Sequence, residues 1–382
     1  MSPERADLVS RWIGSAKRFV YEARWVLAAF VASRLVVFGV ILLARGILVP
    51  GELWHPGGLL SVLGQFDAEL WYMTIVRYGY SFSTTHVSPA PFFPFYPILV
   101  KLVSFVFNDV PVAAFIVSHS CLLGAGLLLD ALIKLDYDDA RVSRRAVMFF
   151  MFGPASFFFS HAYTESTFLL LAIGAFYGAR RGWWLAACVC GMLLSATRNV
   201  GVLIALPLLI EYVRQTYAVA GFRGLFHPRI LLLGLVPLGL GAFMLFSYLK
   251  FNDPLAFVHA SKVWGRHFTT PAVTFSTFKL YVPILKFLFA TSMLTWLLVW
   301  TAGLFFRLRA SYIVFSALLT AVYLCASSME AWPRYLSVEF PLYIVMGLIT
   351  TRVEQSYEPL LASSVALLTI STALSASGHW IT

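Results

Sequence analysis

The stretch WVLAAFVASRLVVFGVILLA, from Trp25 to Ala44, decides the fold class of this chain. Arg34 is its one charged residue, and a helix of about 20 apolar residues is long enough to cross a lipid bilayer. Basic residues precede the stretch, which is too long for the apolar core of a typical signal peptide. We therefore expect an uncleaved first membrane span whose N-terminus lies in the cytoplasm.

The composition extends this interpretation to the whole chain. Of its 382 residues, 60% are hydrophobic and 12% are charged, with a mean hydropathy of +0.80, whereas soluble domains carry about 25% charged residues. Hydrophobic runs recur over nearly the full length, so we expect residues 1–382 to form one integral membrane domain. The net charge of +10 comes from basic residues spread among short loops, which argues against nucleic-acid binding.

These apolar segments predict an all-α polytopic membrane protein with about 11 transmembrane helices. The candidate spans are 25–46, 112–134, 145–160, 165–180, 183–197, 198–213, 229–249, 280–300, 311–327, 336–351 and 358–377. The spans 183–197 and 198–213 adjoin without a linker, so one broken or re-entrant pair is an alternative. Alternation then places the arginine-bearing connections 135–144, 180–182, 214–228, 301–310 and 352–357 in the cytoplasm, as the positive-inside rule requires.

This topology requires that the apolar stretch from Phe92 to Phe107 does not cross the membrane. Its short length and its prolines, Pro91, Pro94 and Pro97, suit a helix that lies at the membrane interface. Residues 47–111 then form a long first extracytoplasmic loop of amphipathic interfacial helices. Residues 250–279 and 328–335 form further extracytoplasmic loops.

Ionisable residues, with polar and aromatic neighbours, occur in each of five outer connections and lie beside apolar segments. They are Asp67 and Glu69, His161 to Glu165, Arg198 and Asn199, His259, Lys262, Trp264, Arg266 and His267, and Glu330, Arg334 and Tyr335. For any single residue, an ordinary loop charge is an equally good explanation. For the set, convergence on one site at the outer membrane boundary is the better explanation.

The segment Gln65-Phe66-Asp67-Ala68-Glu69-Leu70-Trp71 carries the strongest candidate for catalysis. On a helix, Asp67 and Glu69 point about 200° apart, because each residue turns about 100°, so they are not twin members of one site. Asp67 shares a face with Trp71, a ring suited to covering a sugar, and is the better general base. Capping a helix is the structural alternative for Asp67, and pairing with Arg77 is the alternative for Glu69.

Several short motifs follow one another between about residues 30 and 345. They are Gly64-Gln65-Phe66-Asp67, Tyr78-Gly79-Tyr80, Phe92-Phe93-Pro94-Phe95-Tyr96-Pro97, Gly153-Pro154-Ala155, Tyr163-Thr164-Glu165-Ser166, Ala196-Thr197-Arg198 with Gly201, the run 253–257 with Lys262 and Trp264-Gly265-Arg266, and Pro333-Arg334-Tyr335-Leu336. In this order they resemble the PIG-V family of mannosyltransferases, in its prokaryotic form, within the GT-C glycosyltransferases. Phe66 stands where the family usually has Trp. The family's Arg-x-Asn-Gly pattern appears as Arg198-Asn199-Val200-Gly201, which carries over Arg198 and leaves Asn199 open.

The resemblance implies a GT-C-like bundle and an inverting enzyme that takes mannose from a polyprenyl (dolichyl-type) phosphate on the extracytoplasmic face. It implies Asp67 as the general base for an acceptor hydroxyl. The candidates for supporting the acceptor are Glu69, Glu165, Trp71 and Tyr163. The candidates for binding the donor phosphate are Arg266, Arg334 and Arg198, then Lys262 and His259, and those for the donor sugar or lipid are Trp264, Tyr335 and Asn199.

Neither a metal nor another cofactor is expected. The sequence has no Asp-x-Asp pair in a soluble domain, and arginine can bind phosphate oxygens in two-point fashion without a metal. Cys188-x-Cys190 lacks the further Cys or His that a zinc site needs, so we interpret all four cysteines as buried apolar residues.

Several of these residues have structural alternatives. Arg266 and Arg334 could anchor at the interface by snorkelling. Glu165 could stabilise a helix N-terminus, or it could orient the acceptor or bind an arginine of the phosphate site. Trp71 and Trp264 could belong to the interfacial aromatic belt. Arg34, at mid-span, is expected to meet a lipid phosphate or a carboxylate within the bundle.

A transporter or lipid flippase is the alternative function. Such proteins tend to show internal repeats and to place ionisable residues near the bilayer midplane, whereas we find no repeat here and the polar residues gather near one face. The expected partners are polyprenyl-phosphate mannose, a glycolipid or glycan acceptor and membrane lipids. The sequence does not identify the acceptor. We expect a multi-pass protein of the plasma membrane in a prokaryote, or of the endoplasmic reticulum membrane in a eukaryote.

Overall fold

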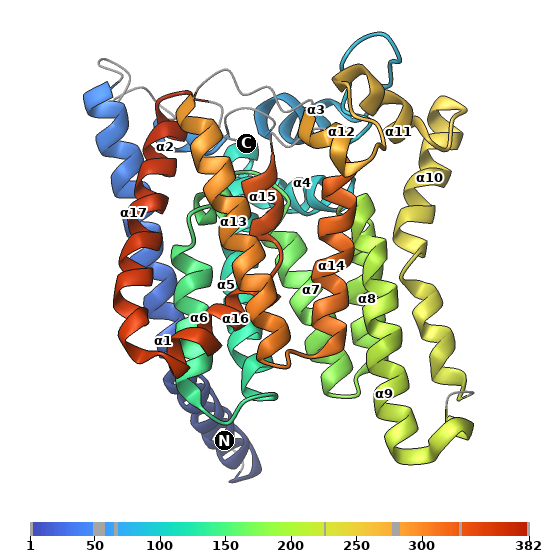
Figure 1. Cartoon of the computed structure of the whole chain (residues 1–382). Coiled ribbons are helices and arrows are strands. Elements are labelled where there is room, and N and C mark those ends of the chain that lie inside the picture. Colours follow the sequence, from blue (N-terminus) through green and yellow to red (C-terminus); the bar gives the residue numbers. More distant parts are fainter. Residues whose placement is uncertain are drawn as a thin grey trace.

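The chain folds as a bundle of helices, without a strand among the described residues (Figure 1). The computed structural model describes residues 3–48, 58–64, 68–224, 227–276, 283–327 and 331–379. The long helices run along the bundle, and α2, α3, α4, α11 and α12 lie at its upper end in Figure 1. Helix α1 begins at the lower end. The all-α fold expected from the sequence is confirmed for this part of the chain.

Helices of two kinds make up the bundle. The longer ones are α1 (Pro3–Leu48), α5 (Val110–Lys134), α6 (Ala140–Phe152), α7 (Glu165–Arg180), α8 (Trp184–Ser195), α9 (Ala205–Gly224), α10 (Leu238–Phe251), α13 (Pro283–Phe305), α14 (Ala310–Leu324), α16 (Pro341–Arg352) and α17 (Tyr357–Ala376). The remaining helices, all shorter than these except α4, are α2 (Gly58–Leu63), η1 (Ala68–Met73), α3 (Thr74–Tyr78), α4 (Phe95–Phe107), η2 (Ser156–Phe159), η3 (Asn199–Ile204), η4 (Pro228–Leu235), α11 (Ala256–Ser261), η5 (Lys262–Trp264), α12 (Pro271–Ser276), α15 (Trp332–Ser337) and η6 (Glu354–Ser356). Helix α5 packs against α7, α6 against α16 and α1 against α17.

Helices of membrane-spanning length occur in both halves of the chain. By length and composition, 4 helical stretches in the described residues could each cross a bilayer: Ala23–Ile47, Val110–Lys134, Asn199–Phe222 and Glu354–Ala376. The pair Pro228–Leu235 and Leu238–Phe251, bent by 42°, passes as one broken span. These helices support a multi-pass membrane protein, and the larger number of spans stays a prediction. The adjoining spans expected at 183–197 and 198–213 are the separate elements α8 and η3–α9.

Helix α4 covers most of the apolar stretch that the expected topology keeps out of the membrane. Its 13 residues extend about 20 Å at 1.5 Å per residue, short of the ~30 Å of a hydrocarbon core. Tyr96 and Val100 are buried on one face, whereas Leu102 and Phe105 are exposed on another. Figure 1 shows α4 at the upper end of the bundle beside the short helices. This length and position support an interfacial helix.

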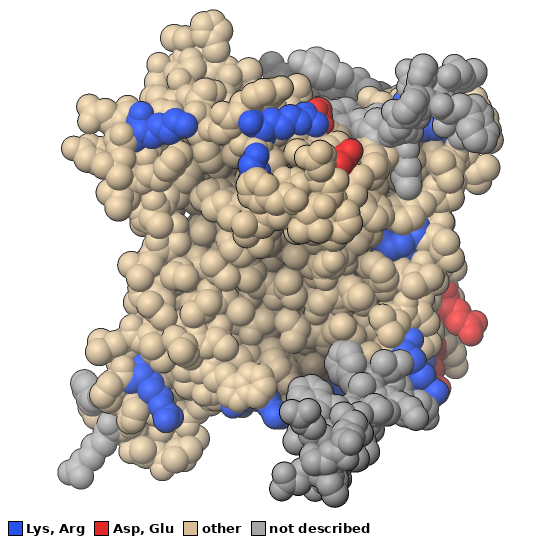
Figure 2. All heavy atoms as spheres, turned by 180° about the vertical axis from the view of Figure 1, so that it is seen from behind, with Lys and Arg blue, Asp and Glu red and all other residues tan. Residues whose placement is uncertain are grey.

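The surface separates charged from uncharged residues. Figure 2 shows that the centre of the back face consists of uncharged side chains, that most Lys and Arg lie toward its upper and lower margins, and that a few charged side chains lie near its right edge at intermediate height. Burying a charge in hydrocarbon is costly, so a band of uncharged surface is what a membrane-embedded bundle requires. The uncharged band in Figure 2 therefore supports a bundle whose long axis crosses the bilayer.

Arg34 contradicts one expectation from the sequence. This fully buried guanidinium donates to the carbonyls of Met151 (3.1 Å) and Ser156 (3.0 Å) and to the hydroxyl of Ser160 (2.5 Å). Its described acceptors are thus carbonyls and hydroxyls, and a carboxylate or lipid phosphate is not needed to satisfy it. The carbonyls in the last turn of a helix lack intrahelical donors, and Arg34 supplies one to α6. It thereby fixes the connection that leads into α7.

The lower end of the bundle is joined by a buried ionic network. Asp136 accepts from Arg180 (2.7 Å) and from Arg309 (2.5 Å), and Glu211 lies 3.3 Å from Arg180 and 3.2 Å from Arg309. Tyr312 also donates to Asp136. The charges of two carboxylates and two guanidiniums therefore balance, and the network ties the ends of α5 and α7 and the start of α14 to Glu211 of α9.

The Glu211→Gln variant tests this network. Removing one charge from a buried pair destabilises a protein by about 3–5 kcal/mol, because the remaining charges are left uncompensated. The exposed pair of Glu354 and Arg141 provides the control, and Glu354→Gln is expected to cost less than about 1 kcal/mol. Thermal unfolding in detergent checks both. Equal melting temperatures for the two variants would contradict the assignment of a stabilising role to the network.

Candidate functional site

A buried ion triad forms the centre of the site at the upper part of the bundle. Glu165, the first residue of α7, is 1% exposed. Its Oε1 accepts from Arg198 Nη2 at 2.8 Å and lies 3.3 Å from Arg334 Nε. Arg198 follows α8, and Arg334 belongs to α15. Three segments that are distant in sequence therefore meet at one carboxylate.

The backbone explains why Arg198 reaches this position. Arg198 has an extended conformation between α8 and η3, with φ −152° and ψ 145°. Gly201 lies so close to α8 that a Cβ there would be 2.2 Å from the carbonyl oxygen of Leu194. Only glycine permits this close approach of η3 to α8, and that approach directs Arg198 toward α7. Glu165 also lies in the first turn of α7, where the helix dipole favours a negative charge.

Tyrosine rings surround the two guanidiniums. Arg334 lies over the rings of Tyr163 and Tyr335, at 5.1 and 5.6 Å, and Arg198 lies 5.7 Å from the ring of Tyr335. The ring of Tyr323 stacks on the ring of Tyr335, with their centroids 4.3 Å apart. Cation–π contacts of this kind stabilise a cation that has lost water.

Arg266 acts on the same tyrosine although its own side chain is exposed. Burial alone would raise the pKa of Tyr335, which lies in the short helix α15. The positive charges of Arg266, Arg334 and Arg198 outweigh this effect and lower the pKa below its usual value. The three arginines proposed from the sequence therefore produce a concentrated positive field around one ring.

Beside the ion triad, the site has an aromatic wall that comes mainly from the first outer loop. Trp71 stacks on Phe92 at 5.5 Å, and its edge meets Trp264 at 5.1 Å. Tyr72, which follows Trp71 in η1, contacts Tyr163 edge-to-face at 6.5 Å. Burial raises the pKa of Tyr72 to about 12, so this hydroxyl is a neutral hydrogen-bonding group. The wall thus joins the expected loop segments 47–111 and 250–279 to the ion triad.

Several buried polar atoms of the ion triad, its surrounding tyrosines and the aromatic wall have no hydrogen-bond partner within the described part of the chain. They are Arg198 Nη1, Glu165 Oε2, Trp71 Nε1, Trp264 Nε1 and Tyr323 Oη. Buried polar groups are nearly always satisfied, so a cluster of such atoms marks a place where a polar ligand fits. Its donors, a guanidinium and two indoles, suit phosphate and sugar oxygens.

Other residues predicted from the sequence lie away from this centre. Glu69 pairs with Arg77 on the exposed surface, which is the alternative considered for it. His259 contacts Asp253 at 2.6 Å. Asn199 is exposed, and its Oδ1 accepts from the Val200 amide. Lys262 is exposed as well. The geometry brings these residues to the same end of the bundle and leaves them outside the triad.

Asp67 itself lies outside the described residues, as does Glu330. Its described neighbours can nevertheless be placed. The Glu69 amide donates to the Gly64 carbonyl at 2.8 Å, and the Leu63 carbonyl accepts from the Ala162 amide at 2.9 Å. The chain on both sides of residues 65–67 is therefore held next to the connection that carries Tyr163 and Glu165.

Metal-binding geometry is not found in the described residues: none of their His, Cys, Asp and Glu side chains form a group of three or more that could hold an ion. Cys121 and Cys188 are buried, and Cys190 and Cys325 are partly buried. All four are free thiols. Independence from a metal remains a prediction.

Sequence reasoning missed Glu339, a fully buried carboxylate near the start of α16. It accepts from Trp296 Nε1 at 3.1 Å, from Thr320 Oγ1 at 2.9 Å and from the Ser316 hydroxyl. It thereby connects α13 and α14 to the segment that bears Arg334. The signal in the sequence was a lone acid five positions after that arginine, inside an apolar run.

Comparison with known proteins bears out the resemblance drawn from the motifs. Residues 52–216 match the family model described as Mannosyltransferase (PIG-V). An alignment of 105 residues, which covers 25% of this chain, gives 32% identity to GPI mannosyltransferase pigv-1 of Caenorhabditis elegans. The matched part spans only 16% of that relative.

Two solved structures align with most of this chain. ArnT from Cupriavidus metallidurans, bound to undecaprenyl phosphate, has a TM-score of 0.54 and 14% identity, covering 92% of this chain and 76% of ArnT. The oligosaccharyltransferase of Archaeoglobus fulgidus has a TM-score of 0.49 and 11% identity, covering 92% of this chain and 55% of that one. The likeness to ArnT supports the helical fold of this chain as a whole.

The Gly201→Ala variant tests the placement of Arg198. A methyl group forced against the Leu194 carbonyl is expected to cost about 1–3 kcal/mol, as overpacking does, and to displace Arg198 from Glu165. Gly234→Ala is the control, since nothing lies within 4 Å of a Cβ there. Thermal unfolding measures the difference. If both variants melt together with the wild type, the close approach does not constrain this turn.

Proposed function

We propose that this chain transfers mannose from a polyprenyl phosphate to a hydroxyl group of a glycolipid or glycan, with inversion at the anomeric carbon. This proposal rests on the similarity of residues 52–216 to PIG-V mannosyltransferases together with the ion triad. Glu165 carries one negative charge against the two positive charges of Arg198 and Arg334. The excess positive charge, reinforced by Arg266, favours a phosphate at this position.

In the proposed reaction, the acceptor oxygen attacks the anomeric carbon of mannose while the bond from that carbon to the phosphate oxygen breaks. The bonding electron pair leaves with the polyprenyl phosphate as a dianion. Asp67 takes the proton of the acceptor hydroxyl as general base. The guanidinium of Arg198, with its second Nη unsatisfied, stabilises the charge that develops on the phosphate. A metal ion is not required in this scheme.

The aromatic wall supports the sugar assignment. The indole N–H groups of Trp71 and Trp264 are buried donors without partners in the described chain. One face of Trp71 is covered by Phe92, so we propose that these two residues recognise sugar hydroxyls with their N–H groups and ring edges. Tyr163 and Tyr335 support the arginines. The ArnT structure contains undecaprenyl phosphate, a lipid phosphate of the class proposed as donor carrier.

The positions of the arginines support an extracytoplasmic site. Arg141 lies in the first turn of α6, Arg180 is the last residue of α7 and Arg309 directly precedes α14. These helix ends lie at the end of the bundle where α1 begins, whereas Glu165 of the triad starts α7 at the other end. Basic connections face the cytoplasm in most membrane proteins. The triad then belongs to the outer half of the molecule, where a lipid-linked sugar would meet its acceptor.

The Asp67→Asn variant tests the general base. Loss of this carboxylate is expected to lower transfer by about 10²–10⁴-fold while the protein still folds and binds the donor. Glu69→Gln is the control and is expected to retain most activity, because Glu69 pairs with Arg77 at the surface. The assay follows radiolabelled mannose from polyprenyl-phosphate mannose into a membrane lipid extract. Full activity of Asp67→Asn removes the residue from this role, and movement of the donor across the bilayer without transfer would favour a flippase.

Donor binding tests the phosphate site. Arg198→Lys and Arg334→Lys keep an ion partner for Glu165 but lose the planar two-point grip of the guanidinium. Each lost charged hydrogen bond is worth about 1.5–3 kcal/mol, so binding of polyprenyl phosphate is expected to weaken by roughly 10–100-fold. Arg77→Lys, at the exposed pair, is the matched control. Unchanged affinity in both site variants would defeat the phosphate assignment.

A further inference from the structure

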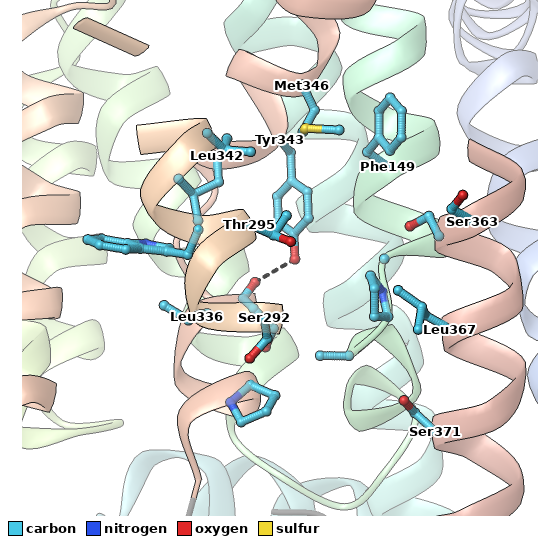
Figure 3. Close-up of a pocket in the computed structure, with 18 of the residues that line it drawn as sticks. Phe149, Ser292, Thr295, Leu336, Leu342, Tyr343, Met346, Ser363, Leu367 and Ser371 are labelled. Carbon is cyan, nitrogen blue, oxygen red and sulfur yellow. Dashed lines mark hydrogen bonds between the residues drawn. The ribbon is translucent and has the colours of Figure 1, made fainter. Parts of the chain in front are cut away.

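The end of α14 attaches one part of the site, the short helix α15, to the bundle. Tyr323, in the last turn of α14, stacks on Tyr335 of α15, with ring centroids 4.3 Å apart. Helix α15 also borders a cavity of about 340 Å³, whose lining includes Pro333 and Leu336 (Figure 3). Atoms that line a cavity lose packing contacts. The stack on Tyr323 is therefore important for holding α15, and with it Arg334, in place.

Directly after α14, residues 325–327 hold a second segment of the site, residues 265–269. The Thr269 amide donates to the Cys325 carbonyl at 2.9 Å. The Ser327 hydroxyl accepts from the His267 amide and donates to the Gly265 carbonyl, each at 3.0 Å. Three hydrogen bonds therefore join two loop segments that are distant in sequence. We call this connection between 265–269 and 325–327 the strap.

The backbone of Ser327 shows that the strap depends on the side chain of this residue. Its φ is +56°, in the left-handed region that glycine adopts freely and that is uncommon for serine. Glycine at this position would adopt the same backbone more easily but would lack the hydroxyl. Strained residues of this kind persist where the surrounding structure holds them. The two hydrogen bonds of the Ser327 hydroxyl are contacts that hold it.

The strapped segment and the residue before it carry two groups that the proposed reaction uses. Trp264 belongs to the aromatic wall, with its ring 5.1 Å from that of Trp71. Burial acts to raise the pKa of Tyr335, and Arg266 contributes the largest of the opposing positive charges. The Arg266 side chain is exposed, so its position depends mainly on how the backbone of 265–269 is held.

We propose that Ser327 is a positioning residue for donor binding, because its hydroxyl fixes 265–269 to the end of α14 and so keeps Trp264 and Arg266 beside the ion triad. The proposal rests on the proposed function, since it concerns the phosphate site of that reaction. Tyr323 and Ser327 lie four positions apart, so α15 and the strapped segment share one attachment. Binding of the donor phosphate and closure of the strap then stabilise each other.

The Ser327→Gly variant tests the proposal on the full chain, because it removes the hydroxyl and leaves the backbone conformation accessible. We expect it to bind polyprenyl phosphate about 5–50-fold more weakly, as the loss of two neutral hydrogen bonds predicts. Ser83→Gly is the matched control. The Ser83 hydroxyl accepts from the Thr85 and His86 amides within its own loop, so this variant should keep wild-type affinity.

Hydrogen exchange reports the strap independently of activity. The peptide that contains His267 and Thr269 should exchange faster in Ser327→Gly than in the wild type, because the strap protects both amides. Added polyprenyl phosphate should slow this exchange in the wild type. When Arg266→Ala is combined with Ser327→Gly, the loss of affinity should be smaller than the product of the two single losses, since both changes remove the same contribution.

A crosslink separates the position of the segment from any direct contact of the hydroxyl with the donor. Thr269→Cys places a thiol opposite Cys325, a partly buried free thiol, and a short bifunctional methanethiosulfonate joins the two. In the Ser327→Gly background this crosslink should restore wild-type affinity for polyprenyl phosphate, and reduction should remove the gain. A serine hydroxyl that bound the donor itself would not be replaced in this way. Melting temperatures equal to the wild type show that the variants are folded.

Three results overturn the proposal: wild-type affinity of Ser327→Gly, unchanged exchange of its 265–269 peptide, and no recovery of affinity in the crosslinked variant. Transfer of mannose is measured on the same preparations. Binding of polyprenyl phosphate that depends on the strap, without any transfer, counts against the proposed function and not against the strap. Transfer by a wild type whose donor affinity does not depend on Ser327 counts against the strap alone.

Discussion

One buried carboxylate holds the candidate site together. Glu165 is almost fully buried, and an isolated charge in that position would cost several kcal/mol. Arg198 and Arg334 offset this cost, and each of them depends on the same carboxylate for its own burial. The residual positive charge is then a property of three segments that are fixed relative to one another. Arginines that moved independently on loops would not hold a phosphate in one fixed position.

The supporting contacts explain how such a site can be rigid. Arg34 holds the end of α6 and the connection that leads to Tyr163 and Glu165. Gly201 sets the turn that carries Arg198. Glu339 joins the segment after Arg334 to α13 and α14. Each segment of the triad therefore has its own attachment to the bundle. The buried network at the lower end performs the same task for the opposite connections.

The sequence predicted the all-helical membrane class and the similarity to PIG-V mannosyltransferases well, because hydropathy and ordered motifs are local properties. It also indicated that Glu69 could pair with Arg77, which depends only on nearby positions. Binding of Glu165 to an arginine of the phosphate site was one of its predicted roles, but the sequence did not show which arginines meet it, since that depends on how α7, the α8–η3 turn and α15 pack. The acceptors of Arg34 were predicted incorrectly for a related reason. Backbone carbonyls at a helix end are effective acceptors that leave no mark in the sequence.

Synthesis of the chain places Arg34 in the membrane long before its acceptors exist. The Met151 carbonyl is 117 residues further along, a delay of roughly 6–23 s at about 5–20 residues per second. During this time a guanidinium near the middle of a span costs about 2.5–3.5 kcal/mol on insertion scales. The apolar remainder of α1 keeps the nascent helix in the bilayer. Its final depth and rotation are set only when the translocon releases α6 beside it.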